Sequence, residues 1–244
     1  MVNISLPLRL LIFVGVIFGL SLISIYYPSF NGDVIYEKKS AIVLRVIDGD
    51  TIETDSGKIR LLGVNTPERG QAYYSDAKGF LGYLVNESVE ILRDVEDLDK
   101  YDRKLRYVFY DDVFVNGLIL ETGLGTSFML EGLVYGEKLK RAEEQGRMNG
   151  VNLWVGSDDE CSECIVLLEL SAEEEFFVLE NVCLKDCSLE GWSVKDDANH
   201  IFNLESVGAG EIVRYDSKGR VWNNAGDRFF MRDKSGGLVV FWEY

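Results

Sequence analysis

Two short segments of the sequence carry oxygen-bearing, acidic and basic side chains at spacings that suit chemistry on a phosphate group. The first reads VLRVIDGDTIETDSGKIRLLGVNTPERG and the second reads DKYDRKLRYVF. Carboxylate, amide and carbonyl oxygens are the ligands that hard cations such as calcium take in proteins. Paired arginines bind phosphate oxygens through their forked guanidinium groups. Together the two segments contain the residue types that hydrolysis of a phosphodiester requires.

The first segment supplies the candidate cation ligands. We expect Asp50, the side-chain carbonyl of Asn65 and a backbone carbonyl at Thr66 to hold a hard divalent cation, calcium in the first place. No histidine or cysteine belongs to this set.

The predicted catalytic groups come from both segments. Arg60 and Arg103 would clamp the phosphate and oppose the charge that builds up in the transition state. Glu68 would orient or deprotonate the attacking water. Lys100 and Tyr101, which precede the second arginine, remain for contact with the substrate.

The elements that must position these side chains are predicted to be strands. Residues 41–47 and 51–54 read as a hairpin, and residues 57–65 read as a third strand. In an antiparallel meander the first turn and the end of the third strand lie at one end of the sheet, so Asp50 and Arg60 would face a shared site. Two later strands, SVEILRD and KLRYVFYDD, and helices near 71–85, 115–122 and 137–148 complete the pattern. Five strands with a helix after the third suggest a small closed barrel of the OB type.

The same residues can also be explained without catalysis. Asp-Gly is a common hairpin turn, and Asp48 could merely cap it. Arg60 and Arg103 could be structural ion-pair partners of Glu68. A further alternative is a degenerate OB domain that binds nucleic acid or envelope components without cutting, which Asn65 and the acidic composition favour.

Composition narrows the chemistry. The chain has 244 residues, 47% hydrophobic and 27% charged, which suits one or two globular domains. Its single histidine, His200, argues against the many hydrolases that use imidazole ligands or bases, so a hydrolase here should work with carboxylates. The net charge of −16 repels polyanions, so nucleic-acid binding needs a local basic site or a bridging cation.

An apolar segment precedes the predicted barrel. Residues 10–27, LLIFVGVIFGLSLISIYY, carry no charge and approach the length that spans a bilayer. We favour an uncleaved transmembrane anchor over residues 1–31 and a linker at 32–40, with a cleaved signal peptide as the alternative. The chain is therefore expected to be a single-pass protein of the cell membrane whose soluble domains are extracellular.

Two soluble domains are expected after this anchor. The first spans residues 41–155, and the acidic stretch GSDDECSE at 156–163 is predicted to be a linker. Residues 164–244 contain strand-like runs with turn signals about every eight to twelve residues, which is typical of an antiparallel sandwich. The predicted fold class is mainly β: a five-stranded OB barrel with helices, an immunoglobulin-like sandwich and one N-terminal transmembrane helix.

The two polar segments, together with the later run NGVNLW, resemble the thermonuclease family, also called staphylococcal nuclease-like. The similarity covers about residues 41–155 and contains both motif blocks in order. It implies an OB-fold, calcium-dependent phosphodiesterase that acts on DNA and RNA. It also implies that Asp50 and Thr66 hold calcium, that Arg60 and Arg103 clamp the phosphate and that Glu68 is the base.

Three positions depart from this pattern. The family commonly has a second metal-binding aspartate where this chain has Asn65, so we expect weaker calcium binding, which extracellular sites with dissociation constants of about 0.1–1 mM tolerate. Glycine is common in the family where Asp102 stands, and this carboxylate would weaken substrate binding or pair with Arg103. The tyrosines that some members place against the nucleotide fall at Met129 and Glu131, which weakens the expectation of base stacking.

Residues 164–244 resemble the lamin-tail domain, an immunoglobulin-like sandwich attached to many secreted or surface nucleases. The matching runs are EFFVLEN, LEGWSVKD, HIFNL, VWNNAGD and RDKSGGLVVFWEY. The resemblance implies an accessory module for attachment or binding, with an unknown envelope or surface partner and no catalytic set of its own.

Four cysteines form two close pairs around the start of this domain: Cys161 with Cys164, and Cys183 with Cys187. Outside the cell we expect them to form disulfides, whose pairing the sequence does not reveal. A four-thiolate zinc site is the alternative, since the spacings permit it. We favour disulfides because of the predicted anchor.

Overall fold

A computed structural model describes residues 37–129 and 131–244 of the chain. The predicted anchor at residues 1–31 and most of the predicted linker at 32–40 lie outside the described residues. Among the helices that are described, none combines the length and the apolar character needed to cross a membrane.

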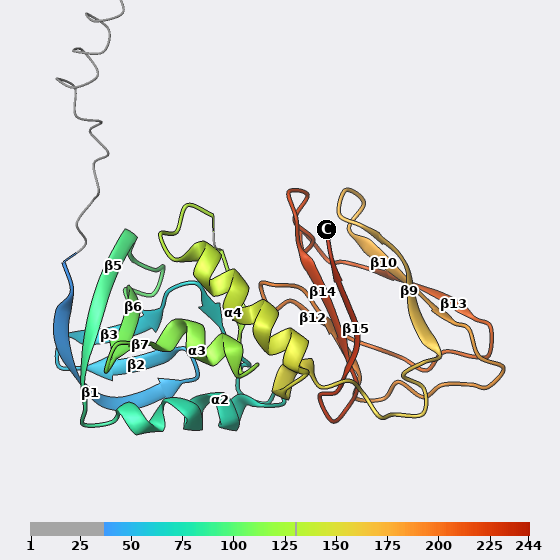
Figure 1. The fold of residues 1–244 in the computed structure, drawn as a ribbon. Helices are drawn as coiled ribbons and strands as arrows, with labels where there is room; N and C mark the ends of the chain where they lie inside the picture. The colour runs from blue at the N-terminus through green and yellow to red at the C-terminus, as the bar shows by residue number, and fades with distance from the viewer. Residues whose placement is uncertain (1–36, 130) are drawn as a thin grey trace, which may run out of the picture. The chain divides into compact units, whose positions relative to one another are not determined.

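The first part of the described chain is a closed β-barrel, called the barrel domain below (residues 37–155; Figure 1). The sheet order is β3-β2-β1-β5-β6-β7, and a parallel pairing of β3 with β6 closes the ring. Apolar side chains that alternate along the strands, among them Val43, Ile52 and Ile59, are fully buried inside it. The strands are β1 (Lys39–Asp48), β2 (Thr51–Thr54), β3 (Gly57–Leu61), β5 (Ser88–Leu98), β6 (Lys104–Tyr110) and β7 (Val113–Phe114).

Helices pack beside the barrel strands and on one another. They are α2 (Tyr74–Phe80), α3 (Val115–Glu121), α4 (Gly136–Asn149) and the 3₁₀ turns Leu81–Leu84 and Asn152–Trp154. Buried Asn116 fixes α3 to the barrel, because its side chain accepts from the Val108 amide at 2.8 Å and donates to the Leu62 carbonyl at 2.9 Å. Helix α4 is capped at its C-terminus by Gly150, whose φ of 60° is the left-handed conformation that glycine adopts most readily.

Two predicted elements differ from the structure. The helix expected near 71–85 is a short α-helix followed by a 3₁₀ turn, in a sequence that Gly79 and Gly82 weaken as a helix former. The third strand expected over 57–65 is divided, because Gly63 has a φ of 75° and turns the chain away from the barrel. The second half becomes β4 (Val64–Asn65), which pairs with β8 (Thr126–Ser127) instead of with a barrel strand.

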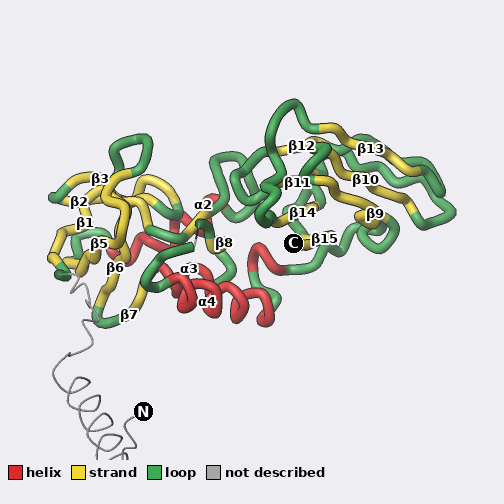
Figure 2. The backbone as a smooth tube through the Cα atoms, turned by 90° about the horizontal axis from the view of Figure 1, so that it is seen from above, coloured by secondary structure: helices red, strands yellow, loops and turns green. Residues whose placement is uncertain are grey.

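The second part is an antiparallel β-sandwich, called the sandwich below (residues 156–244; Figure 2). One sheet has the order β13-β10-β9 and the other β12-β11-β14-β15. Buried aromatic side chains, Phe177, Trp192, Trp222 and Phe229, belong to one hydrophobic core cluster. The strands are β9 (Ile165–Ser171), β10 (Phe176–Asn181), β11 (Ser193–Lys195), β12 (Ile201–Asn203), β13 (Ile212–Asp216), β14 (Arg228–Arg232) and β15 (Leu238–Glu243). The expectation of an antiparallel sandwich is confirmed.

The cysteines form two disulfides, as favoured from the sequence. Cys161 is bonded to Cys187, and Cys164 to Cys183, so each pair that is close in sequence is split between two bridges. All four cysteines are in disulfides, so the structure does not contain the alternative four-thiolate zinc site.

The acidic stretch 156–163, expected to be a linker, is bonded to the rest of the sandwich at Ser157, Glu160 and Cys161. The Ser157 amide donates to the Leu238 carbonyl at 2.9 Å, and the Ser157 hydroxyl donates to the Asp233 carboxylate at 2.5 Å. Cys161 is buried in the sandwich core.

Candidate functional site

The turn between β1 and β2 brings the first acidic residues of the site against the Thr66 loop. Gly49 makes this approach possible, because a Cβ atom there would lie 2.7 Å from Thr66 Oγ1 and 2.7 Å from Ala77 Cβ. On the two sides of the glycine, Asp48 accepts a hydrogen bond from the Tyr74 hydroxyl at 2.9 Å, and Asp50 is almost fully buried. The hairpin thus presents two carboxylates beside Thr66.

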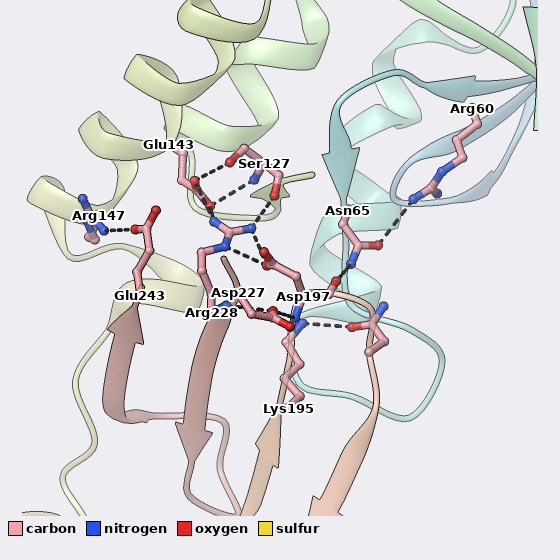
Figure 3. Close-up of polar contacts among 11 residues, drawn as sticks. Arg60, Asn65, Ser127, Glu143, Arg147, Lys195, Asp197, Asp227, Arg228 and Glu243 are labelled. Atoms are coloured by element: carbon pink, nitrogen blue, oxygen red, sulfur yellow. Dashed lines mark hydrogen bonds and ion pairs between the residues drawn. The ribbon is translucent and has the colours of Figure 1, made fainter. Parts of the chain in front are cut away.

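Arg60 connects the hairpin to the end of the next strand segment. It faces Thr51 across the β2–β3 pairing, and its guanidinium forms an ion pair with the Asp50 carboxylate. The same group donates to the Val64 carbonyl at 3.2 Å and to Asn65 Oδ1 at 3.4 Å. The oxygens of Asp50, Val64 and Asn65 therefore converge on one guanidinium, and Figure 3 shows the Asn65 amide directed at Arg60.

Arg103 joins this group from the start of β6. Its Nη1 donates to Thr51 Oγ1 at 3.1 Å, and Thr51 Oγ1 in turn donates to Asp50 Oδ1 at 2.7 Å. Asp99 holds the other edge of the guanidinium by an ion pair of 2.6 Å. Both predicted phosphate-binding arginines thus lie within one hydrogen-bonded chain that passes through Thr51.

The Asp99 carboxylate is bound tightly enough to change its acidity. Burial raises its pKa, but the amides of Arg103 and Tyr101 and the Arg103 guanidinium all donate to it and outweigh that effect. The pKa of Asp99 therefore lies below its ordinary value, and the carboxylate stays charged opposite Arg103.

These residues surround one cavity of about 870 Å³. Every predicted ligand, catalytic group and substrate contact lies on its wall: Asp50, Arg60, Asn65, Thr66, Glu68, Lys100, Tyr101 and Arg103. The structure brings the whole predicted set to one cavity, although the two motif blocks are far apart in the sequence. The roles of the individual residues stay predictions.

Side chains of the set differ in exposure. Asn65 and Thr66 are buried in the wall, whereas Glu68 is exposed at it. Tyr101 is 66% exposed, and the Lys100 ammonium lies 5.1 Å from the centre of its ring. The exposed side chains can therefore reach a substrate, while the buried ones are fixed by the protein.

Of the three departures from the family pattern, Asn65 and the positions Met129 and Glu131 lie on the cavity wall. Met129 and Glu131 stand where the resemblance placed stacking tyrosines. Asp102 has a φ of 60°, the conformation that favours glycine at this position. Arg103 forms its ion pair with Asp99, so Asp102 is not the carboxylate that engages it.

The donor set suits a hard cation. Asp50, the Asn65 amide oxygen and the Thr66 segment offer only oxygen atoms, and the first two already converge on the positive charge of Arg60. Among the described residues, no group of three or more His, Cys, Asp and Glu side chains could hold a metal ion. A calcium site here would consequently depend on the amide and on backbone oxygen as well as on carboxylates.

Two contributors to the site were not recognised from the sequence. Asp99 stood inside the second motif, but its ion pair with Arg103 forms across a turn, where an i, i+4 spacing does not carry the meaning that it has on a helix. Ala198 belongs to the sandwich and lines the cavity, and the backbone carbonyl of its neighbour Asp197 accepts from Asn65 Nδ2 at 3.1 Å. No local pattern indicates a contact over 132 residues.

The closed barrel is a small OB-type domain, and oxygen-bearing side chains and guanidinium groups line its cavity. A sequence model of the family described as Staphylococcal nuclease homologue matches residues 58–156. The thermonuclease of Staphylococcus intermedius is 31% identical over 157 residues, which cover 57% of this chain and 94% of that protein. The thermonuclease of Staphylococcus hyicus is 34% identical over 124 residues, covering 46% of this chain and 73% of that protein.

A more distant relative, an uncharacterized endonuclease of Haemophilus influenzae, is 27% identical over 128 residues, covering 50% of this chain and 70% of that protein. The chain belongs to the staphylococcal nuclease family, as the resemblance of its motifs indicated. The match to the family model ends at residue 156, before most of the sandwich. The lamin-tail resemblance of residues 164–244 stays a prediction.

Proposed function

We propose that this chain is a calcium-dependent nuclease that hydrolyses phosphodiester bonds of DNA, RNA or both. The observation that carries the proposal is the convergence of Asp50, Asn65, Arg60 and Arg103 on one cavity, joined through Thr51. Membership of a nuclease family supports the same conclusion.

Each group has a role that its position suits. Asp50, the Asn65 amide oxygen and the Thr66 carbonyl would hold calcium, which when bound supplies Lewis-acid stabilisation of charge on the phosphate. Arg60 and Arg103 bind the phosphate oxygens and oppose the charge that develops in the transition state. Glu68, exposed at the cavity wall, accepts a proton from the attacking water.

The charge of the cavity supports a role for a cation. Six carboxylates line it, those of Asp48, Asp50, Glu68, Glu96, Asp99 and Glu131, against three basic side chains, Arg60, Lys100 and Arg103. Such a wall attracts a divalent cation and repels a bare polyanion. Substrate affinity should therefore rise with calcium concentration.

We also propose that the enzyme is tethered to the outer face of the cell membrane by its N-terminal segment. The uncharged run at residues 10–27 supports a tether, and two disulfides support an oxidising compartment. The sandwich would then position the barrel domain at the surface, against an envelope or surface partner.

The test is digestion of single-stranded DNA and of RNA by the full-length chain while calcium is titrated from micromolar to tens of millimolar. We expect cleavage that requires calcium and that falls about 10²–10³-fold in Arg60→Ala and in Glu68→Gln. Arg220→Ala and Glu173→Gln, which change the same residue types at exposed positions of the sandwich, serve as controls and should cut normally. Cleavage that persists in both site variants would overturn the assignment.

A nucleic-acid-binding protein that does not cut is the second candidate. Asn65 favours it, because the amide contributes one negative charge less than an aspartate to the cation site. The same titration separates the two, since this candidate predicts calcium-dependent retention of labelled single-stranded DNA without any shortening of the strand.

A further inference from the structure

Asn65 has a fixed orientation, and one of its two partners belongs to the sandwich. Its Oδ1 accepts from Arg60 Nη2 at 3.4 Å, and its Nδ2 donates to the Asp197 backbone carbonyl at 3.1 Å (Figure 3). A flipped amide would place its NH₂ against the guanidinium and its oxygen against the carbonyl, which is two mismatches. The Asp197 carbonyl therefore keeps the amide oxygen on the side of Arg60 and the cavity.

Asp197 is itself held by an arginine of β14. Arg228 Nε donates to Asp197 Oδ1 at 2.7 Å, and Arg228 Nη2 lies 2.5 Å from the same oxygen. The Asp197 amide donates to Asp227 Oδ1 at 3.2 Å. Backbone and side chain of Asp197 are thus both fixed to the start of β14.

Arg228 also reaches back into the barrel domain. Its Nη1 donates to both carboxylate oxygens of Glu143 on α4, at 2.7 and 2.9 Å. Burial lowers the pKa of Arg228, but Glu143 and Asp197 together outweigh that effect and raise the pKa, so the buried guanidinium stays charged. We call these contacts of Asn65, Ser127, Glu143, Asp197 and Arg228 the seam.

The seam also includes strand β8, which pairs with the strand that carries Asn65. Glu143 accepts from the Ser127 amide at 3.0 Å and from its hydroxyl at 2.6 Å, and Arg228 donates to the Ser127 carbonyl. Ser127 lies on β8, whose residue Thr126 pairs with Asn65 of β4. Backbone and side chain of Asn65 are consequently both connected to Arg228, one through β8 and the other through Asp197.

We propose that the sandwich is a working part of the nuclease site, with Asp197 as a positioning residue that aims the Asn65 oxygen at the bound cation. The inference rests on the proposed function and extends it to residues outside the nuclease family match. It also accounts for the departure at position 65. An aspartate there would place a carboxylate oxygen against the Asp197 carbonyl, whereas an asparagine donates to it.

Asp197→Ala is the informative substitution. It releases the loop from Arg228, while Arg228 keeps Glu143 as its counter-ion, so we expect the full-length chain to stay folded. The matched control is Asp216→Ala, which removes an aspartate paired with Arg214 on the exposed strand β13. Thermal unfolding checks both variants, and Asp197→Asn, which removes only the charge, is the milder second variant.

Calcium binding by isothermal titration calorimetry is the first readout. We expect Asp197→Ala to raise the calcium Kd about three- to tenfold, the effect of losing one typical hydrogen bond, and Asp216→Ala to leave it unchanged. Cleavage by Asp197→Ala should recover at saturating calcium, because the groups that act on the phosphate are untouched. In an Asn65→Ala background the further change Asp197→Ala should leave the Kd as it is, since Asp197 acts through Asn65.

The seam can be observed without any activity. In the ¹⁵N-labelled wild-type chain the Asn65 side-chain amide protons should exchange slowly, and in Asp197→Ala they should exchange at the rate of a solvated amide. Equal calcium Kd values for Asp197→Ala and Asp216→Ala, or a full effect of Asp197→Ala in the Asn65→Ala background, would overturn the positioning role. A wild-type chain that neither binds calcium nor cuts would overturn the proposed function and this role with it, while a protected Asn65 amide would still support the link to the sandwich.

Discussion

The barrel domain and the sandwich differ in where their basic side chains lie. In the barrel domain Arg60 and Arg103 stand at the wall of a cavity, each paired with a nearby aspartate. In the sandwich three basic side chains, Arg228, Lys195 and Arg232, lie around the ring of Phe230, and Arg228 is buried. The first arrangement leaves guanidinium groups within reach of a ligand, and the second uses them inside the protein.

This difference indicates different roles for the barrel domain and the sandwich. Trp154, at the end of the barrel domain, packs on Phe230 and Phe241 of the sandwich with ring centres 6.1 and 5.3 Å apart. The buried charges lie on the same face, next to residues that support Asn65. The sandwich therefore presents to the barrel domain a surface of aromatic rings and buried cations, which suits attachment and support more than chemistry.

Breaking the seam at Arg228 should have the largest effect on stability. Arg228→Met leaves the buried carboxylate of Glu143 and the partly buried one of Asp197 without their cation, which costs about 3–5 kcal/mol. Urea unfolding followed by tryptophan fluorescence measures the loss. Arg214→Met, at a half-exposed ion pair of β13, is the matched control and should cost less than about 1 kcal/mol. Similar losses in the two variants would show that the seam contributes no special stability.

Removing a disulfide should cost somewhat less. Cys161→Ser with Cys187→Ser opens a crosslink over 26 residues, and Cys164→Ser with Cys183→Ser opens one over 19 residues. Loops of these sizes predict a loss of about 3 kcal/mol each in the free energy of unfolding. Urea unfolding with and without reducing agent measures it, and a chain with all four cysteines replaced should no longer respond to the reductant. A wild-type chain that is indifferent to reduction would contradict the expected role of the bridges.

The sequence was sufficient for the parts of the site that depend on local geometry. Asp50 and Arg60 come together through one hairpin and one strand pairing, and periodicity indicates both. The sequence did not reveal that residues 57–65 are divided into two strands. The turn at Gly63 divides them, but the strand-like pattern continues on both sides of it. The partner of Asn65 is a backbone carbonyl of Asp197, and a backbone atom leaves no trace in residue type. Contacts of this kind follow from the docking of two domains, which no local pattern specifies.

A smaller effect concerns Lys195, beside the seam. Burial and the nearby cations Arg232 and Arg228 lower its pKa to about 8, against the opposite effect of Asp197 and Asp196. Between about pH 8 and 10.5 the unfolded chain keeps the proton that the folded chain has lost, so this residue makes stability rise with pH across that window. Below pH 8 Lys195 is protonated in both states, and the folded state carries the full free-energy cost of burying its charged ammonium.

Replacing Lys195 by methionine should therefore stabilise the chain by about 2 kcal/mol at pH 7 and reduce the rise in stability between pH 8 and 10.5. Urea midpoints measured at steps through this window test both expectations. Lys218→Met, at an exposed position of the same domain, should change neither. A destabilised Lys195→Met at pH 7 would show that the ammonium contributes more through its 3.0 Å bond to Asn199 than its burial costs.

The smallest expected effect is a change in calcium affinity, and it tests directly whether the sandwich influences the site of the barrel domain. Asn65→Asp adds a negative charge to the cation site, and ligand charge alone predicts about tenfold tighter calcium binding. In the intact chain, however, the new carboxylate oxygen meets the Asp197 carbonyl at the place where the amide donates at 3.1 Å. We therefore expect a change in calcium Kd of less than about threefold, because this repulsion offsets most of the gain.

Combining Asn65→Asp with Asp197→Ala frees the loop to move away, so the full gain of about tenfold should appear only in the double variant when it is compared with Asp197→Ala alone. Calorimetric titration of the four chains gives the coupling directly. Equal gains in both backgrounds would mean that the barrel domain sets its calcium affinity without the sandwich. Unequal gains would mean that the asparagine at position 65 is matched to the domain that follows it.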